Sequence, residues 1–299
     1  MFRILALLFL MTPGLTLAQQ ADRLPAYLLQ VPASVVAIFV AETDTSTLHR
    51  FDTVTSVAGP RDERYISVGQ NGVGKQKAWD HRTPLGIYFI SEELDTSGLH
   101  ERYGPLAFPL DYPNVWDRAN QRGGDGIWIH GVAPDAGRRP PLDTDGCIAL
   151  PNDALMEMRE QFVPLVTPVI ITRQIHWLMP EQVFARRDEI TAILGRWAES
   201  YRSGDLYGYL SLYAEDFAYR GMTREEWASY RMHGFSGTRL SEFTLTEVLL
   251  LADPEDEGLY LSRFRQTIVD DERTITTIKR LYWRRTADGD LEIVAEDNG

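Results

Sequence analysis

Cysteine is almost absent from this sequence: its 299 residues contain one, Cys147. A single thiol cannot form a disulfide within its own chain, so a small fold stapled by disulfides is excluded. Histidine is also scarce, with six residues that are scattered and not grouped with Cys, Asp or Glu at the spacing of metal ligands. The sequence therefore predicts no metal site and no cofactor, and the purpose of the one thiol has to be explained otherwise.

Positive charge is in short supply as well. Lys and Arg total 30 against 43 Asp and Glu, which gives a formal net charge of −13. Nucleic-acid binding depends on clustered Lys and Arg that neutralise phosphates. This balance argues against a nucleic-acid partner.

Long apolar runs are missing too. The run Ile4–Met11 is too short to cross a bilayer, and no later stretch is long enough. Arg3 precedes it and the small residues Thr16-Leu17-Ala18 follow it, which is typical of a secretory signal peptide over residues 1–18, cleaved after Ala18. A buried N-terminal helix or an uncleaved anchor is the alternative. We expect an exported, periplasmic protein without a transmembrane span in its mature form.

The length suggests two domains, and strand patterns dominate the first, which we expect over residues 34–173 after a short lead at 19–33. Its expected strands are dense in β-branched residues: Ser34–Ala41, Thr47–Val54, Tyr65–Gly69, Ile87–Ser91, Gly126–His130, Cys147–Leu150 and Pro168–Thr172. One helix is expected at Ala154–Phe162, with Asn152 as its N-cap, and residues 94–120 look irregular. The pattern predicts a mostly-β sandwich or barrel with one main helix.

The second domain is expected at residues 185–299, after a connector at 174–184 that Pro180 interrupts. Three helices come first: Ala185–Ser203, a second capped by Asp205 through Tyr213, and a third capped by Thr223 through Met232, with Glu226 in the capping box. Four strands follow: Ser241–Leu251, Gly258–Val269, Thr274–Arg285 and Leu291–Ala295. This order predicts a compact α+β domain with a four-stranded antiparallel meander.

Cys147 and His130 have the residue types of a thiol-nucleophile site. The thiolate is the attacking species, and a neighbouring imidazole can take the thiol proton if its other ring nitrogen is held by an acceptor. Gly146 lets the backbone approach a substrate, and amides around Asp145, Gly146 and Cys147 could form an oxyanion hole. The alternatives are a small buried Cys and a structural or solvated His.

Several motifs in a fixed order resemble those of the YkuD, or L,D-transpeptidase, family. The pair His130-Gly131 followed by Thr144-Asp145-Gly146-Cys147 is similar to its active-site signature, and the segment Thr83–Tyr88 to its upstream TPxGxY turn. The resemblance covers roughly residues 34–172. It implies an enzyme acting on the stem peptides of bacterial peptidoglycan, at the bond between the L-centre of meso-diaminopimelate and D-Ala.

The resemblance also implies roles for individual residues. Cys147 would be the nucleophile and His130 the general base, with the Gly131 carbonyl orienting the imidazole. The amides of Gly146 and Cys147 would form the oxyanion hole. After D-Ala leaves, the thioester passes to an amine, giving a 3-3 cross-link, or to water, giving a tripeptide.

Asp145 departs from the family pattern, which usually has histidine two residues before the cysteine. Its carboxylate and that of Asp143 should raise the pKa of the thiol unless neighbours offset them. Asp145 could instead attract the free amine of diaminopimelate, or it could be a solvated turn residue.

Further candidates for substrate contacts are Thr144 and the pair Arg138 and Arg139, whose guanidinium groups suit stem carboxylates. A solvated loop pair is the alternative for the arginines, and Lys75 and Lys77 have a weaker case. Trp79 and Trp128 are expected to pack and not to serve as sugar platforms.

Residues 185–299 resemble an NTF2-like domain, a cone with a pocket that often dimerises, which implies a possible homodimer. The resemblance rests on Trp197, Tyr201, Tyr213, Phe217 and Trp227. Asp216 and His233 are its only nominal site candidates.

The two-domain layout is similar to that of the L,D-carboxypeptidases that set cell shape in curved bacteria. The sequence favours an L,D-transpeptidase, with an L,D-carboxypeptidase as the first alternative and a non-catalytic wall-binding protein as the second.

Overall fold

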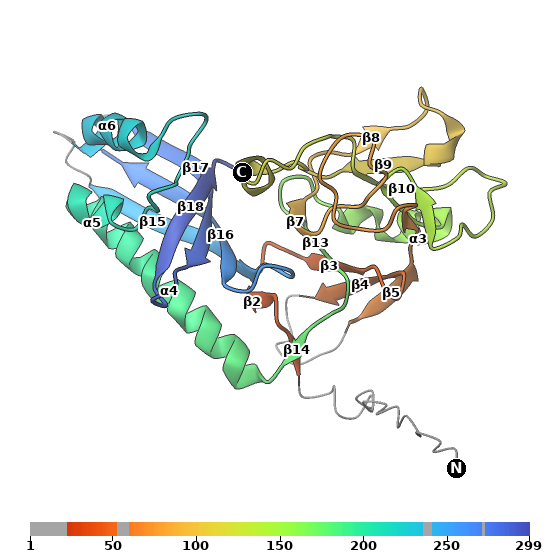
Figure 1. Ribbon diagram of the computed structural model, residues 1–299, viewed down its shortest axis with the longest axis horizontal. Helices are drawn as coiled ribbons and strands as arrows, with labels where there is room; N and C mark the ends of the chain where they lie inside the picture. The colour runs from red at the N-terminus through yellow and green to blue at the C-terminus, as the bar shows by residue number, and fades with distance from the viewer. Residues whose placement is uncertain (1–22, 53–59, 236–240, 271–272) are drawn as a thin grey trace, which may run out of the picture.

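The computed structural model describes residues 23–52, 60–235, 241–270 and 273–299. The expected signal peptide lies outside these ranges. Figure 1 shows two halves side by side, one mostly β and one built of helices on a sheet, with the C-terminus where they meet. Both fold classes expected from the sequence are confirmed. Within the described residues, no helix combines the length and apolar character needed to cross a membrane.

The two larger sheets of the first half enclose one core. The larger has the order β5-β4-β3-β13-β7: Asp62–Tyr65, Thr47–Asp52, Ala37–Glu42, Pro168–Thr172 and Gly86–Phe89. The smaller has the order β12-β10-β9-β8: Ile148–Ala149, Trp128–His130, Leu106–Pro109 and Leu94–Asp95. Phe162 packs between the two sheets. Its ring centroid lies 4.5 Å from that of Phe39 in β3 and 4.8 Å from that of Phe108 in β9.

Two expected segments of this half differ in the structure. Residues 94–120 are not irregular: they form β8, the 3-10 turn Glu101–Tyr103, β9 and the helix α2 (Val115–Ala119). Each of these elements is too short to show a clear periodicity. The expected strand Tyr65–Gly69 is interrupted, since β5 ends at Tyr65 and a separate strand, β6 (Val68–Gly69), pairs with β11 (Leu142–Thr144).

The main helix of this half, α3, spans Asn152–Met158 and is followed by the 3-10 turn Arg159–Gln161. Its N-cap is Pro151, not Asn152. The Asn152 side chain instead accepts the N–H of Val132 at 2.8 Å and donates to the Val132 carbonyl at 2.9 Å. Asn152 therefore does not cap the helix but holds the segment after β10 in place through these two hydrogen bonds.

The second half packs helices on a sheet. The long helix α4 spans Pro180–Ser203 and starts five residues earlier than expected, because Pro180 occupies the first turn, where its missing N–H costs nothing. It ends at Gly204, and α5 (Leu206–Leu210) is capped by Asp205 as expected. The capping box of α6 (Arg224–Phe235) also forms, between Thr223 and Glu226.

The sheet of this half has five strands, where the sequence predicts four. The expected meander forms as β15 to β18: Glu242–Ala252, Leu259–Val269, Thr274–Arg285 and Leu291–Asp297. The fifth strand, β2 (Leu28–Gln30), comes from the N-terminal lead and pairs antiparallel with β15. The lead also supplies β1 (Leu24–Pro25), which pairs with β14 (Trp177–Leu178) of the connector.

The two halves share one apolar cluster. It joins β3, β7 and β13 of the first half to α4 and the sheet of the second. At its edge, Arg280 of β17 binds Asp111 of the first half and Asp297 of β18. The Arg263 and Arg280 guanidinium carbons lie 5.5 and 5.3 Å from the centre of the Phe89 ring in β7. These contacts fix the second domain against the first.

Candidate active site

Cys147 and His130 come together through the pairing of β10 with β12. The strands run parallel, with Ile129 opposite Ile148 and His130 opposite Ala149. Ile129 and Ile148 both belong to the buried core. Because side chains alternate along a strand, His130 and Cys147 face the other side. There both line one cavity of about 460 Å³.

His130 is held as a neutral imidazole. Its Nδ1 lies 2.6 Å from the Gly131 carbonyl oxygen, and the edge of the Tyr103 ring packs against it with centroids 5.2 Å apart. A carbonyl can only accept, so Nδ1 carries the proton and Nε2 is left as the base. Burial lowers the pKa of His130 to about 4, and the Gly131 carbonyl opposes this shift.

Gly131 is required by packing. A Cβ at this position would lie 2.3 Å from Asn152 Oδ1 and 2.9 Å from Pro105 Cδ. Gly104, which has a positive φ of 65°, also packs closely against Gly131. A Cβ added to Gly104 would lie 2.8 Å from the Gly131 carbonyl carbon. The carbonyl that orients His130 is thus fixed by α3 on one side and the 101–105 segment on the other.

Cys147 is a buried, protonated thiol. Its Sγ donates to the Gly126 carbonyl at 3.3 Å. Burial raises the pKa of Cys147 to about 11; the Trp128 backbone lowers it and the charge of Asp145 raises it further. The site therefore rests as a neutral thiol beside a neutral imidazole, not as an ion pair.

The loop before Cys147 is tied together by Thr144. Its Oγ1 accepts the Gly146 N–H at 3.1 Å and donates to the Cys147 carbonyl at 2.7 Å. Gly146 has a φ of 126°, and a Cβ there would lie 2.7 Å from the Arg82 carbonyl oxygen. The Gly146 N–H is thus already bonded. In the described part of the chain, the Cys147 N–H donates to no acceptor.

Asp145 is an exposed bend residue, but its carboxylate has partners within the protein. Its Oδ1 lies 3.0 Å from His81 Nδ1 and 3.5 Å from Gln70 Nε2, and its Oδ2 lies 3.5 Å from Arg102 Nη1. It links three loops at the mouth of the cavity. A substrate amine would have to compete with His81 and Arg102 for this carboxylate.

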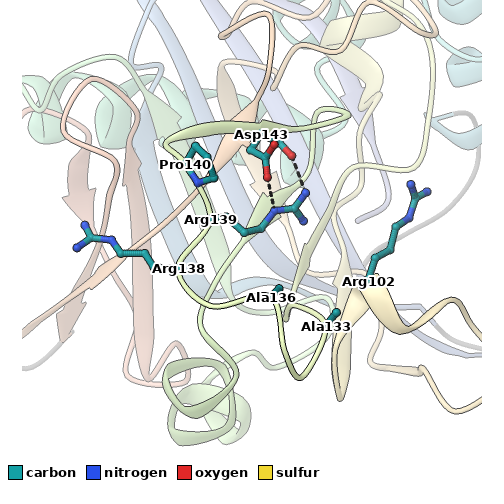
Figure 2. A pocket seen from close by; sticks show the side chains of 7 residues that line it. All are labelled: Arg102, Ala133, Ala136, Arg138, Arg139, Pro140 and Asp143. Carbon is teal, nitrogen blue, oxygen red and sulfur yellow. Dashed lines mark hydrogen bonds and ion pairs between the residues drawn. The ribbon is translucent and has the colours of Figure 1, made fainter.

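Arg138 and Arg139 point in different directions (Figure 2). Arg139 is bound to Asp143, with Nε 2.9 Å from Oδ2 and Nη2 2.6 Å from the carbonyl oxygen. Arg138 places its guanidinium carbon 3.8 Å from the centre of the Tyr65 ring, and it does not line the cavity of Cys147. Both line a second cavity of about 230 Å³, which also contains Arg102.

Other residues around the thiol differ from the sequence expectations. Lys75 is buried, with Nζ 2.8 Å from Asp80 Oδ1, so it is not a free surface cation. Trp79 lines the cavity and is 87% exposed, so the expected packing role was wrong for it. Trp128 does pack, with its ring 4.9 Å from that of Tyr103.

Three cavity residues, His81, Arg102 and Tyr103, carry no signal in the sequence, because they come from segments remote from Cys147 in the chain. In the second domain, Asp216 is ion-paired with Arg284 at 2.8 Å. The His233 side chain lies outside the described part of the structure. Within the described ranges, no group of three or more His, Cys, Asp or Glu residues is arranged to hold a metal ion.

Comparison with known families agrees with this geometry. Residues 40–171 match the model of the L,D-transpeptidase catalytic domain of the YkuD family, and residues 189–297 match that of the Cds6 C-terminal NTF2-like domain. The chain therefore carries an L,D-transpeptidase catalytic domain of the YkuD family, a family of enzymes that act on peptidoglycan, followed by an NTF2-like domain.

Two solved structures resemble nearly the whole chain. Bd1075 from Bdellovibrio bacteriovorus is 23% identical with a TM-score of 0.77, covering 93% of this chain and 98% of its own. Pgp2 from Campylobacter jejuni, a helical cell shape determining protein, is 25% identical with a TM-score of 0.71, covering 93% and 95%. A search of curated proteins finds no match.

Proposed function

We propose that this protein is an L,D-carboxypeptidase that uses Cys147 to remove D-Ala from the tetrapeptide stems of peptidoglycan. The observation that carries the proposal is the shared cavity of Cys147 and His130, in which the Gly131 carbonyl leaves His130 Nε2 as a base. A site degraded to simple wall binding would have no reason to keep this arrangement.

The first half-reaction forms a thioester. Sγ of Cys147 attacks the carbonyl carbon of the diaminopimelate–D-Ala bond while Nε2 of His130 takes the thiol proton. Because the thiol pKa is about 11 and the imidazole pKa about 4, a free ion pair is unfavourable, and the proton moves as the C–S bond forms. His130 then protonates the leaving amine of D-Ala.

The oxyanion of the tetrahedral intermediate needs N–H donors. The Cys147 N–H is the available one, and Gly146 can add a second if Thr144 Oγ1 releases its N–H. In the second half-reaction His130 takes a proton from water, which attacks the thioester and releases the tripeptide and the Cys147 thiol.

Water is our preferred acceptor because the two-domain layout resembles cell-shape L,D-carboxypeptidases and because Pgp2, a cell-shape protein, matches over 93% of this chain. A role in cell shape follows from the same likeness. Transfer to an amine remains the second candidate. It is supported by the cavity of about 230 Å³ beside the site, which could receive an acceptor stem.

The proposal also covers where the protein is located and whether it dimerises. We place the mature protein in the periplasm after removal of residues 1–18, and we expect residues 34–173 to carry catalysis while residues 185–299 position substrate or mediate a homodimer. N-terminal sequencing of the secreted protein tests the cleavage site, and sedimentation equilibrium tests the dimer.

The reaction is tested by incubating purified protein with disaccharide-tetrapeptide and analysing the products by mass spectrometry. A tripeptide supports hydrolysis, whereas a cross-linked dimer supports transfer. Absence of turnover, or equal turnover by Cys147→Ala, would overturn the enzymatic proposal.

A further inference from the structure

Lys75, Arg102, Arg139 and the imidazole of His81 line the cavity around Cys147, and three of these four side chains are bonded to partners inside the protein. Arg139 makes two contacts with Asp143. Lys75 donates to Asp80 Oδ1 and to the Lys77 carbonyl oxygen, at 2.8 and 3.1 Å, and is almost fully buried. His81 is bonded to Asp145.

Arg102 is the exception. Its side chain is 53% exposed, with Nη2 2.7 Å from the Tyr103 hydroxyl and Nη1 3.5 Å from Asp145 Oδ2. A guanidinium has five N–H donors, so these two contacts leave three for a ligand. Arg102 also lines both cavities. Figure 2 shows it across the smaller cavity from Arg138.

The position of Arg102 relative to the site is fixed by its backbone. It lies in the 3-10 turn Glu101–Tyr103, whose cap is the His100 side chain accepting the Arg102 N–H at 3.2 Å. The turn leads into Gly104, which is pressed against Gly131, and the Tyr103 ring packs on His130. The charge of Arg102 lowers the pKa of both Cys147 and His130, as expected of a cation close to the reacting pair.

We propose that Arg102 binds the free carboxylate of the terminal D-residue that the enzyme removes, and so restricts cleavage to the C-terminal end of the stem. The inference rests on the proposed function. In a terminal residue the carboxylate is one carbon away from the nitrogen of the attacked bond, so its partner must stand near the thiol. A planar guanidinium can bind a carboxylate through two parallel hydrogen bonds. Arg102, not Arg138 or Arg139, is thus the carboxylate anchor.

The test compares a disaccharide-tetrapeptide with a free terminal carboxylate and the same molecule with a terminal amide. The unsubstituted protein should prefer the carboxylate in kcat/KM by roughly 10- to 100-fold, the range expected for losing a charged hydrogen-bonded contact. Arg102→Gln should raise KM for the carboxylate substrate and reduce this preference to near unity. Arg102→Lys should restore part of it, because it keeps the charge but loses the two-point contact.

Arg159→Gln is the matched control, because Arg159 is similarly exposed, at 49%, in the same domain, and pairs with Glu93. It should keep the full preference. The proposal is overturned if the unsubstituted protein cleaves both substrates equally, or if Arg102→Gln keeps the preference. Failure of the proposed function looks different: neither substrate is cleaved, or Cys147→Ala cleaves as well as the parent.

Discussion

His81 Nδ1 lies 3.0 Å from Asp145 Oδ1, so an imidazole from a distant loop stands beside the carboxylate that precedes the thiol by two residues. In the family pattern a histidine usually occupies the position of Asp145 itself. Here the imidazole reaches the same region of the cavity from another part of the chain. Asp145 thus organises the cavity mouth, and its charge also opposes ionisation of Cys147.

Asp145→Asn should lower the pKa of the Cys147 thiol, because it removes a negative charge that raises it. Below the thiol pKa, the rate of alkylation follows the thiolate fraction, so iodoacetamide should react roughly two- to tenfold faster at pH 8 to 9. Asp143→Asn is the control, since Asp143 is paired with Arg139. Equal rates for Asp145→Asn and the parent would show that Asp145 does not act on the thiol.

Substrate with an acetylated diaminopimelate amine tests whether Asp145 binds that amine. If it does, acetylation raises KM in the parent but not in Asp145→Asn. Because His81 and Arg102 already occupy the carboxylate, we expect acetylation to change KM by the same factor in both proteins. If acetylation raises KM in the parent but not in Asp145→Asn, Asp145 binds the amine.

The pH dependence of kcat/KM should have its acidic limb near pH 4 and not near the usual histidine value of about 6.5. Only neutral His130 can accept the thiol proton, so activity falls as pH drops through its pKa. The rate should stay level up to about pH 9, because the thiol pKa is about 11. Steady-state measurements of kcat/KM from pH 3.5 to 9 test this. An acidic limb between pH 6 and 7 would show that burial does not lower the pKa of His130.

Gly131→Ala should abolish most activity. The new Cβ would collide with Asn152 Oδ1 and Pro105 Cδ, displacing the carbonyl that orients His130. A displacement of about 1 Å at a catalytic group can cost on the order of 100-fold in rate. The control is Gly123→Ala, where nothing lies within 4 Å of the added Cβ. Activity of Gly131→Ala within threefold of the parent would show that the carbonyl position is not critical.

Arg280→Met should destabilise the whole protein. The substitution leaves Asp111 and Asp297 without their shared cation at the domain junction. Breaking a buried ion pair on one side costs roughly 3–5 kcal/mol. Urea unfolding should show this loss, while Arg202→Met, whose pair with Glu199 is exposed, should leave the urea midpoint nearly unchanged. Equal effects would mean that the junction adds little to stability.

Much of the fold could be predicted because its signals are local. The strands of the second domain are long, at 7 to 12 residues, and the caps at Asp205 and Thr223 depend on neighbouring residues. The fifth strand of that sheet could not be predicted, since β2 has three residues and gains its partner from more than 200 positions away. The elements between residues 94 and 120 could not be predicted either, because each of them is also short.

The site was predictable only in part. Cys147 and His130 stand out because the thiol is unique and a glycine follows the histidine. The loop residues around them, Arg102 and His81, have no distinctive spacing, and their proximity to the thiol depends on how three loops fold together. Trp79 shows the same limit: an aromatic side chain was assigned to packing although the loop carries it into solvent.

The most direct test of the account is the intact mass of the protein during a single turnover with disaccharide-tetrapeptide. We predict a transient adduct equal to the substrate minus D-Ala, located on Cys147 by peptide mapping, formed slowly in His130→Ala and absent from Cys147→Ala. Substrate loss without any adduct on Cys147, or the same products from Cys147→Ala, would contradict the thioester mechanism.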